Sequence, residues 1–144
     1  SKYPSLLNKF IFLEKNIDHE KHLANHNNID LFVDTYPCNG HTTTSDIILF
    51  EKPLITISGN TFPSRVAGSI LTEVGLKNLI CNDLEEYESK INYYIKNNHE
   101  LKKLVKSINT KKLFNVKDYT VSLENAYQRV YELRAENKFE DIYV

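Results

Sequence analysis

The chain has 144 residues, of which 41% are hydrophobic and 26% are charged, and its formal net charge is −1. This size and composition predict one globular domain with a hydrophobic core. The small net charge gives no electrostatic reason to expect nucleic acid or an anionic membrane as a partner. No apolar run approaches the roughly 20 residues that span a bilayer, and the amino end has no signal-peptide pattern, so a soluble, cytoplasmic protein is expected.

The first elements in chain order are a predicted strand and a histidine-rich helix. The apolar run at residues 10–13 is typical of a buried parallel strand, and residues 18–28 predict a helix that begins at Asp18. Three histidines share a face of that helix and could hold a metal: His19, His22 and His26. No carboxylate or cysteine pattern accompanies them, so surface histidines are the preferred interpretation and no metal is expected.

The stretch that carries the chemistry follows a second predicted strand, residues 31–34, and leads into a helix expected over residues 42–51. Its sequence is Cys38-Asn39-Gly40-His41-Thr42-Thr43-Thr44-Ser45-Asp46. The first N–H groups of a helix lack internal partners and carry partial positive charge, so this turn predicts a cradle for a phosphate or a nucleotide. Gly40 would let the main chain approach the ligand, the threonines offer hydroxyls, and Asp46 could accept a hydrogen bond from a sugar hydroxyl. An N-capped helix without a ligand explains the same pattern.

The remaining elements predict a parallel sheet that ends in helices. Residues 54–57 form a third strand, a helix begins near Pro63 and stops at Gly75, and residues 76–81 contain a fourth strand. Three more helices are expected, the last over residues 118–137, with these apolar positions available for packing: Val121, Leu123, Tyr127, Val130, Tyr131 and Leu133. The order predicts an α/β fold with helices on both faces of a mostly parallel sheet and a single domain over residues 1–144.

Several motifs, in one order, resemble the carboxyl-terminal catalytic half of the O-GlcNAc transferases. They are Val33-Asp34-Thr35, Tyr36-Pro37-Cys38-Asn39-Gly40-His41-Thr42-Thr43, Asp46, Gly59-Asn60-Thr61, Ser64-Arg65-Val66-Ala67, Asp83-Leu84-Glu85-Glu86-Tyr87 and the segment from Leu113-Phe114-Asn115 to Tyr127. Motifs spaced in this way are more specific than a single Gly-rich turn. The resemblance implies a Rossmann-like, nucleotide-sugar-binding lobe of a two-lobed GT-B glycosyltransferase, with the family's tetratricopeptide repeats and amino-terminal catalytic lobe absent from this chain.

The resemblance also implies a role for each polar residue of the motif. His22 would stack on uracil, while His19 and Asn25 stand where many relatives carry Lys and Arg. The implied contacts are His41, Thr42 and Thr43 to the donor diphosphate, Asp46 to the ribose, His22 and Asn25 to the nucleobase, and Cys38, Asn39 and Gly40 to the donor sugar. No cofactor or metal is expected, because the helix N-terminus and its side chains would stabilise the diphosphate. A lysine that neutralises the leaving diphosphate in the family has no counterpart in this chain.

The implied function is transfer of N-acetylglucosamine from UDP-GlcNAc to Ser and Thr hydroxyls of proteins, with this chain as the donor-binding part and inactive by itself. Its partners would be the UDP-sugar, the absent lobe and repeats, and protein acceptors, with no nucleic acid and no membrane. The alternatives are a GDP-fucose-dependent O-fucosyltransferase lobe, a non-catalytic nucleotide-sugar-binding scaffold, and a structural domain in which the turn only caps a helix. Related O-fucosyltransferases tend to lack the histidine, so His41 favours the UDP-sugar branch.

Overall fold

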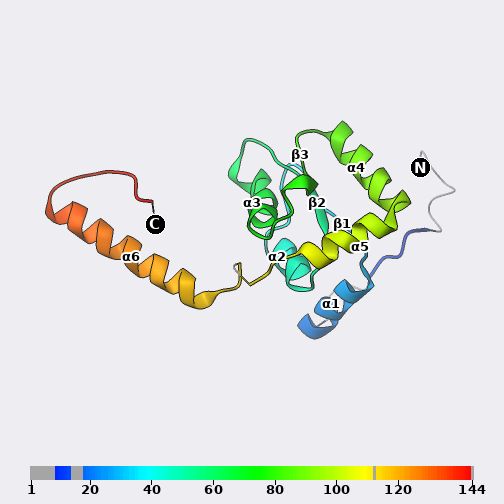
Figure 1. Ribbon diagram of the computed structural model, residues 1–144, viewed down its shortest axis with the longest axis horizontal. Coiled ribbons are helices and arrows are strands. Elements are labelled where there is room, and N and C mark those ends of the chain that lie inside the picture. Colours follow the sequence, from blue (N-terminus) through cyan, green and yellow to red (C-terminus); the bar gives the residue numbers. More distant parts are fainter. Residues whose placement is uncertain (1–8, 14–17, 112, 144) are drawn as a thin grey trace.

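The computed structural model describes residues 9–13, 18–111 and 113–143, which form an α/β body and one long projecting helix (Figure 1). Its first part contains helix α1 (His19–Asn25), the 3-10 turn η2 (His26–Asn28), strand β1 (Phe32–Val33) and helix α2 (Thr42–Leu49). Its central part contains strand β2 (Leu54–Ile57), turn η3 (Phe62–Ser64), helix α3 (Val66–Glu73), turn η4 (Lys77–Leu79) and strand β3 (Ile80–Cys81). The last three elements are helices α4 (Leu84–Lys96), α5 (Asn98–Ser107) and α6 (Val116–Ala135).

The described residues form a parallel three-stranded sheet in the order β1-β2-β3. Phe32 pairs with Leu54, and Ile57 pairs with Cys81, so both neighbours of β2 run in the same direction as β2. All four residues of β2 are buried, because α2 and α3 lie on one side of the strand and α4 lies on the other (Figure 1). The predicted parallel sheet with helices on both faces is confirmed.

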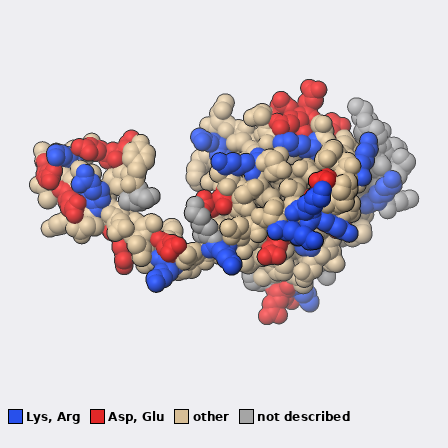
Figure 2. Space-filling model, viewed as in Figure 1, with Lys and Arg blue, Asp and Glu red and all other residues tan. Residues whose placement is uncertain are grey.

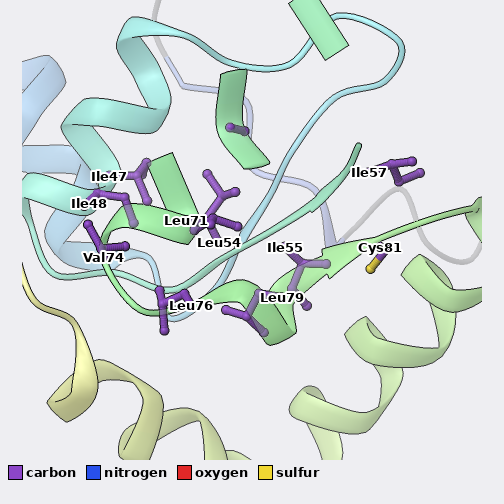
Figure 3. Close-up of a cluster of buried hydrophobic side chains, with 11 residues drawn as sticks. Ile47, Ile48, Leu54, Ile55, Ile57, Leu71, Val74, Leu76, Leu79 and Cys81 are labelled. Carbon is purple, nitrogen blue, oxygen red and sulfur yellow. The ribbon is translucent and has the colours of Figure 1, made fainter. Parts of the chain in front are cut away.

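The hydrophobic core packs against β2 and fixes the strand ends that precede the two strand-to-helix turns (Figure 3). Ile47 and Ile48 of α2, Leu54 and Ile55 of β2, and Leu71 of α3 have no exposed surface. Complete burial of each such aliphatic side chain contributes roughly 1.5–3 kcal/mol to folding. The turns that follow β1 and β2 therefore start from a well-anchored sheet.

The apolar run at residues 10–13 does not form the predicted strand. Its side chains are exposed, from 60% for Phe10 to 88% for Phe12. A buried parallel strand needs a hydrogen-bonded neighbour and cover on both faces, and the described residues provide neither to this run. The prediction is wrong because an apolar pattern indicates that a segment suits burial but does not supply the partners that bury it.

Helix α6 projects away from the body in Figure 1. Of the six apolar positions expected to pack, the structure buries Leu133 and leaves these exposed: Val121, Leu123, Tyr127, Val130 and Tyr131. The helix itself is confirmed and begins two residues earlier than predicted. Its apolar face is largely uncovered by the described residues.

Charged side chains of both signs are spread over the face shown in Figure 2, with basic ones gathered over α5 and acidic ones over the start of α4. Lys102, Lys103 and Lys106 of α5 are exposed, which fits a solvated helix face. In the part of the chain that the structure describes, no helix is long and apolar enough to cross a membrane.

Candidate functional site

The turn between β1 and α2 is held by a buried carboxylate, that of Asp34, directly after β1. Its Oδ1 atom accepts a hydrogen bond from the Gly40 N–H at 2.7 Å, and its Oδ2 atom accepts one from the Thr56 hydroxyl at 2.6 Å. The Tyr87 hydroxyl donates to the Asp34 carbonyl oxygen. Burial, followed by the nearby Asp34 carboxylate, raises the pKa of Tyr87 to about 12, so this hydroxyl keeps its proton as a donor. Asp34 thus ties the turn to both β2 and α4.

Gly40 and Thr44 close this turn against the first turn of α2. Thr44 is completely buried, and its hydroxyl donates to the Gly40 carbonyl oxygen at 2.6 Å. A Cβ atom at Gly40 would lie 3.0 Å from Thr44 Oγ1 and 3.3 Å from Asp34 Oδ1, so lack of space favours glycine. Gly40 therefore lets the main chain approach the side chains of Thr44 and Asp34 rather than the ligand that the sequence suggests. The Gly40 N–H is already hydrogen-bonded to Asp34.

The first turn of α2 faces the surface beyond the end of β1. His41, the N-cap residue, is exposed, and its side chain makes no capping hydrogen bond to any described residue. Thr42 is exposed and Thr43 is half-buried at the first two helical positions. The intrahelical pattern begins with the Ser45 N–H, which donates to the His41 carbonyl oxygen at 3.1 Å. The N–H groups of the three residues before Ser45 lack a helical acceptor, which is the arrangement that binds anions.

The loop before α2 orients its asparagine inward and its cysteine outward. The Asn39 side chain is buried and donates through Nδ2 to the carbonyl oxygens of Thr35 at 3.1 Å and Ile57 at 3.3 Å. Within the described residues, the buried Asn39 Oδ1 atom has no hydrogen-bond partner. Cys38 is exposed. Of the residues expected beside a sugar, Cys38 therefore offers its side chain to the surface, whereas Asn39 fixes the loop.

The residues expected to contact a nucleoside come from α1 and α2. His22 and Asn25 lie on α1, and Asp46 lies on α2, one turn after Thr42. The His22 ring is exposed and stands edge to face with the buried ring of His26, with 5.0 Å between ring centroids. Asp46 is near enough to influence His26 electrostatically. His22 of α1 and Asp46 of α2 thus both lie near His26.

The metal hypothesis for the histidines of α1 gains no support from the geometry. The side chain of His19 lies outside the described part of the structure. Among the side chains that are described, no group of three or more His, Cys, Asp and Glu residues is placed to hold a metal ion. His22 and His26 instead contact each other through their rings.

An open cavity of about 790 Å³ lies beside the second strand-to-helix turn. Ser58, Phe62 and Arg65 line it together with residues of α3 and with Ile80 of β3. The residues predicted to bind a ligand are not among its lining, although the Phe62 ring stands edge to face with His41 at 6.0 Å between centroids. The candidate site is therefore the surface over the start of α2, and Phe62, which lines the cavity, contacts the edge of this site through His41.

Comparison with known proteins identifies what this fold and this turn are similar to. The family model described as glycosyl transferase family 41 matches residues 4–123. A probable UDP-N-acetylglucosamine–peptide N-acetylglucosaminyltransferase, SEC of Arabidopsis thaliana, is 35% identical over 109 residues, which are 72% of this chain and 11% of that protein. The UDP-N-acetylglucosamine–peptide N-acetylglucosaminyltransferase of Caenorhabditis elegans is 37% identical over 70 residues, 49% of this chain and 6% of its own.

A solved structure is similar as well. A mutant O-GlcNAc transferase from Thermobaculum terrenum superposes with a TM-score of 0.60 and 26% sequence identity, covering 78% of this chain and 22% of that one. The chain thus spans about a tenth of the length of the curated Arabidopsis relative and about a fifth of the solved bacterial chain.

Proposed function

The chain belongs to glycosyl transferase family 41, and from this membership we propose that it forms the donor-binding part of a protein O-GlcNAc transferase. In this proposal the donor is UDP-GlcNAc and the acceptors are Ser and Thr hydroxyls of proteins. Residues 1–144 make one domain, and the tetratricopeptide repeats and the amino-terminal lobe belong to the remainder of a longer protein. The chain alone is inactive, because it presents a donor site without the lobe that helps to form the acceptor site.

The observation that carries this proposal is the first turn of α2, held in place by the buried Asp34 carboxylate. The exposed His41 and Thr42, with the half-buried Thr43, surround the unpaired N–H groups at this helix N-terminus. A diphosphate placed there would receive backbone hydrogen bonds, side-chain donors and the positive end of the helix dipole together. This group of donors is supported by Asp34 before the ligand arrives, so little reorganisation accompanies binding.

The nucleoside would extend from this turn toward α1. Asp46 would accept hydrogen bonds from the ribose, and the exposed His22 ring would stack on the base, with Asn25 beside it. The sugar would lie over the loop at Cys38, with Asn39 and Gly40 shaping that loop from within.

The chemistry of the complete enzyme is displacement at the anomeric carbon. A bond forms between the acceptor oxygen and this carbon while the bond to the diphosphate breaks. The proton of the acceptor hydroxyl passes to the departing diphosphate or to water, and negative charge develops on the departing UDP. Donors aimed at the diphosphate stabilise that charge more in the transition state than in the bound donor, which lowers the barrier. Metal-free transfer is part of the proposal, since the α2 N-terminus performs the electrostatic role that a cation would otherwise have.

Calorimetric titration of the chain with UDP, UDP-GlcNAc and GDP tests donor binding. UDP and UDP-GlcNAc should bind more tightly than GDP, and Thr43→Ala should weaken UDP binding by about tenfold or more, since a hydrogen bond to a charged group contributes roughly 1.5–3 kcal/mol. Thr120→Ala is the matched control, because Thr120 is exposed on α6. Absence of binding to all three ligands would contradict the proposal, and tighter binding of GDP would favour a GDP-sugar donor.

A further inference from the structure

His26 is the most deeply buried histidine that the structure describes, and the proposed donor chemistry does not use it. It is the first residue of η2, directly after α1, and 4% of its surface is exposed. One side of its ring meets His22 from the preceding helical turn, and another side meets Phe50 at the end of α2, with 5.5 Å between ring centroids. Its Nδ1 atom is buried and has no partner among the described residues. His26 is thus packed as an aromatic ring between two helices.

The surroundings of His26 favour its neutral form. Burial lowers the pKa of His26 below its ordinary value of 6.5, nearby His22 lowers it further, and Asp46 acts in the opposite direction. A neutral ring whose Nδ1 atom has no hydrogen-bond partner among the described residues is poorly suited to proton transfer. Its contribution is the aromatic ring that it packs against the exposed His22.

An exposed histidine on a seven-residue helix has several rotamers available, and stacking on a base requires one of them. The His22 and His26 rings stand at 81° to each other with centroids 5.0 Å apart, which is a favoured aromatic geometry. Because His26 is fixed by burial and by Phe50, this contact selects the orientation of His22. We propose that His26 is a positioning residue that holds the His22 ring at a steep angle to its own ring and thereby prepares it to receive the nucleobase of the donor.

This inference rests on the proposed function, since it assigns the nucleobase contact to His22. An edge-to-face contact of this kind accounts for about two- to tenfold in affinity. His26→Ala should therefore weaken UDP binding by about twofold to tenfold, whereas His26→Phe, which keeps a ring of similar shape, should bind UDP like the parent protein. Inorganic pyrophosphate, which lacks a base, should bind equally to all three proteins. A loss of pyrophosphate binding equal to the loss of UDP binding would overturn the proposal, since it would indicate general damage to the fold.

A double-mutant cycle distinguishes an effect of His26 that acts through His22 from an effect of His26 on the site that does not involve His22. If His26 acts by orienting His22, then His26→Ala should change UDP affinity by less than about twofold in a His22→Ala background, because the interaction is already removed. Equal losses in both backgrounds would overturn the proposal. His99→Ala is the matched control, since His99 is an exposed histidine on α5 and should leave UDP affinity unchanged in either background.

A measurement on the unliganded protein tests the positioning of His22 by His26 independently of whether the protein binds UDP. In NMR spectra of the unliganded protein, the ring protons of His22, assigned by their disappearance in His22→Gln, should shift in His26→Ala and return toward their original positions in His26→Phe. Unchanged His22 resonances in His26→Ala would overturn the positioning role. If the parent protein binds no UDP and the His22 resonances behave as expected, the proposed function fails while the positioning of His22 by His26 stands.

Discussion

Asp34 shows how strongly the candidate site depends on one buried side chain. Its two carboxylate oxygens serve different segments, the Gly40 turn and strand β2, through the hydrogen bonds from Gly40 N and Thr56 Oγ1. The residues that we assign to the diphosphate follow Gly40 directly in the chain, and the Gly40 N–H is one of the two donors to this carboxylate. The candidate donor surface and the buried network beneath it therefore meet at Gly40.

Replacing Asp34 with alanine is expected to destabilise the protein by about 2–4 kcal/mol, because it leaves the buried Thr56 hydroxyl and the Gly40 N–H without their acceptor. Urea unfolding followed by circular dichroism measures this loss. Asp30→Ala, at an exposed position just before β1, is the control and should change stability by no more than about 0.5 kcal/mol. Equal effects of the two substitutions would show that the Asp34 bonds do not hold the turn.

Gly59, in the second strand-to-helix turn, and Gly68, in helix α3, provide a pair of substitutions with opposite expected signs. A Cβ atom at Gly59 would lie 2.5 Å from Ser64 Oγ and 2.9 Å from Ser64 Cβ, so Gly59→Ala should destabilise the protein by about 1–3 kcal/mol. At Gly68, within α3, the nearest atom would be Ser58 Oγ at 3.6 Å, an ordinary contact, and Gly68→Ala should stabilise by about 0.5–1 kcal/mol through helix propensity. Thermal unfolding of both variants checks the signs, and a shift in the same direction for both would contradict this account.

The residue types in the sequence predict where the candidate site lies better than they predict which of its side chains reach the surface. The motif predicts an anion site at the start of a helix, and the structure places His41 and Thr42 at the surface there. The pattern cannot distinguish these from Thr44 and Asn39, which point inward and bond to the backbone. The orientation of Asn39 is set by acceptors in the preceding loop and in β2, and the latter is distant along the chain.

At the scale of elements, local signals predict helices and the central strand well. Strand β2 coincides with the predicted residues 54–57. Helix α4 begins after an Asp83 N-cap, whose Oδ1 atom accepts from the Glu86 N–H at 2.8 Å. The flanking strands β1 and β3 have two residues each and are shorter than predicted. Strand length depends on the hydrogen-bonded neighbour, so the sequence of a strand does not determine it. The same dependence explains why the apolar run at residues 10–13 is not a strand.

Helix α4 carries a charged contact that should make its stability pH-dependent. The Glu86 carboxylate accepts from the Asn82 N–H at 2.8 Å and pairs with Lys90 at 2.8 Å. The bond to Lys90, then that to the Asn82 backbone, lowers the pKa of Glu86 from 4.5 to about 2. Because the folded-state value is lower than the unfolded one, this stabilisation is complete above pH 4.5 and is lost as the pH falls toward 2.

Glu86→Gln removes that charge and keeps a side-chain acceptor. The unfolding temperature of the variant should be lower than that of the parent at pH 6, and the difference should shrink toward zero as the pH approaches 2, as measured by thermal unfolding across this range. Glu88→Gln, at an exposed position on the same helix, controls for the general effect of removing a carboxylate. A difference that stays constant over the whole pH range would exclude Glu86 as the source.

At the scale of the whole molecule, the structure separates an α/β body from helix α6. The core and the hydrophobic residues packed against it lie between Ile29 and Leu113, and so do most of the residues that we assign to the donor. The amphipathic pattern of residues 118–137 predicts helix α6 correctly, but this pattern indicates only that one face of the helix suits packing. The periodicity of the sequence does not identify which other residues would cover this face.

Deleting the chain after Asn115 tests whether α6 contributes to the stability of the body. The shortened protein retains Leu113, which packs on the core, and should unfold within a few degrees of the parent, with less helical signal in circular dichroism. Isolated helices of this length are marginal in water, so in the parent protein the amides of α6 should exchange with deuterium much faster than those of the buried strand β2. Thermal unfolding and hydrogen exchange measure the two effects. Loss of the cooperative transition on deletion, together with slow exchange in α6, would show that α6 and the body fold as one unit.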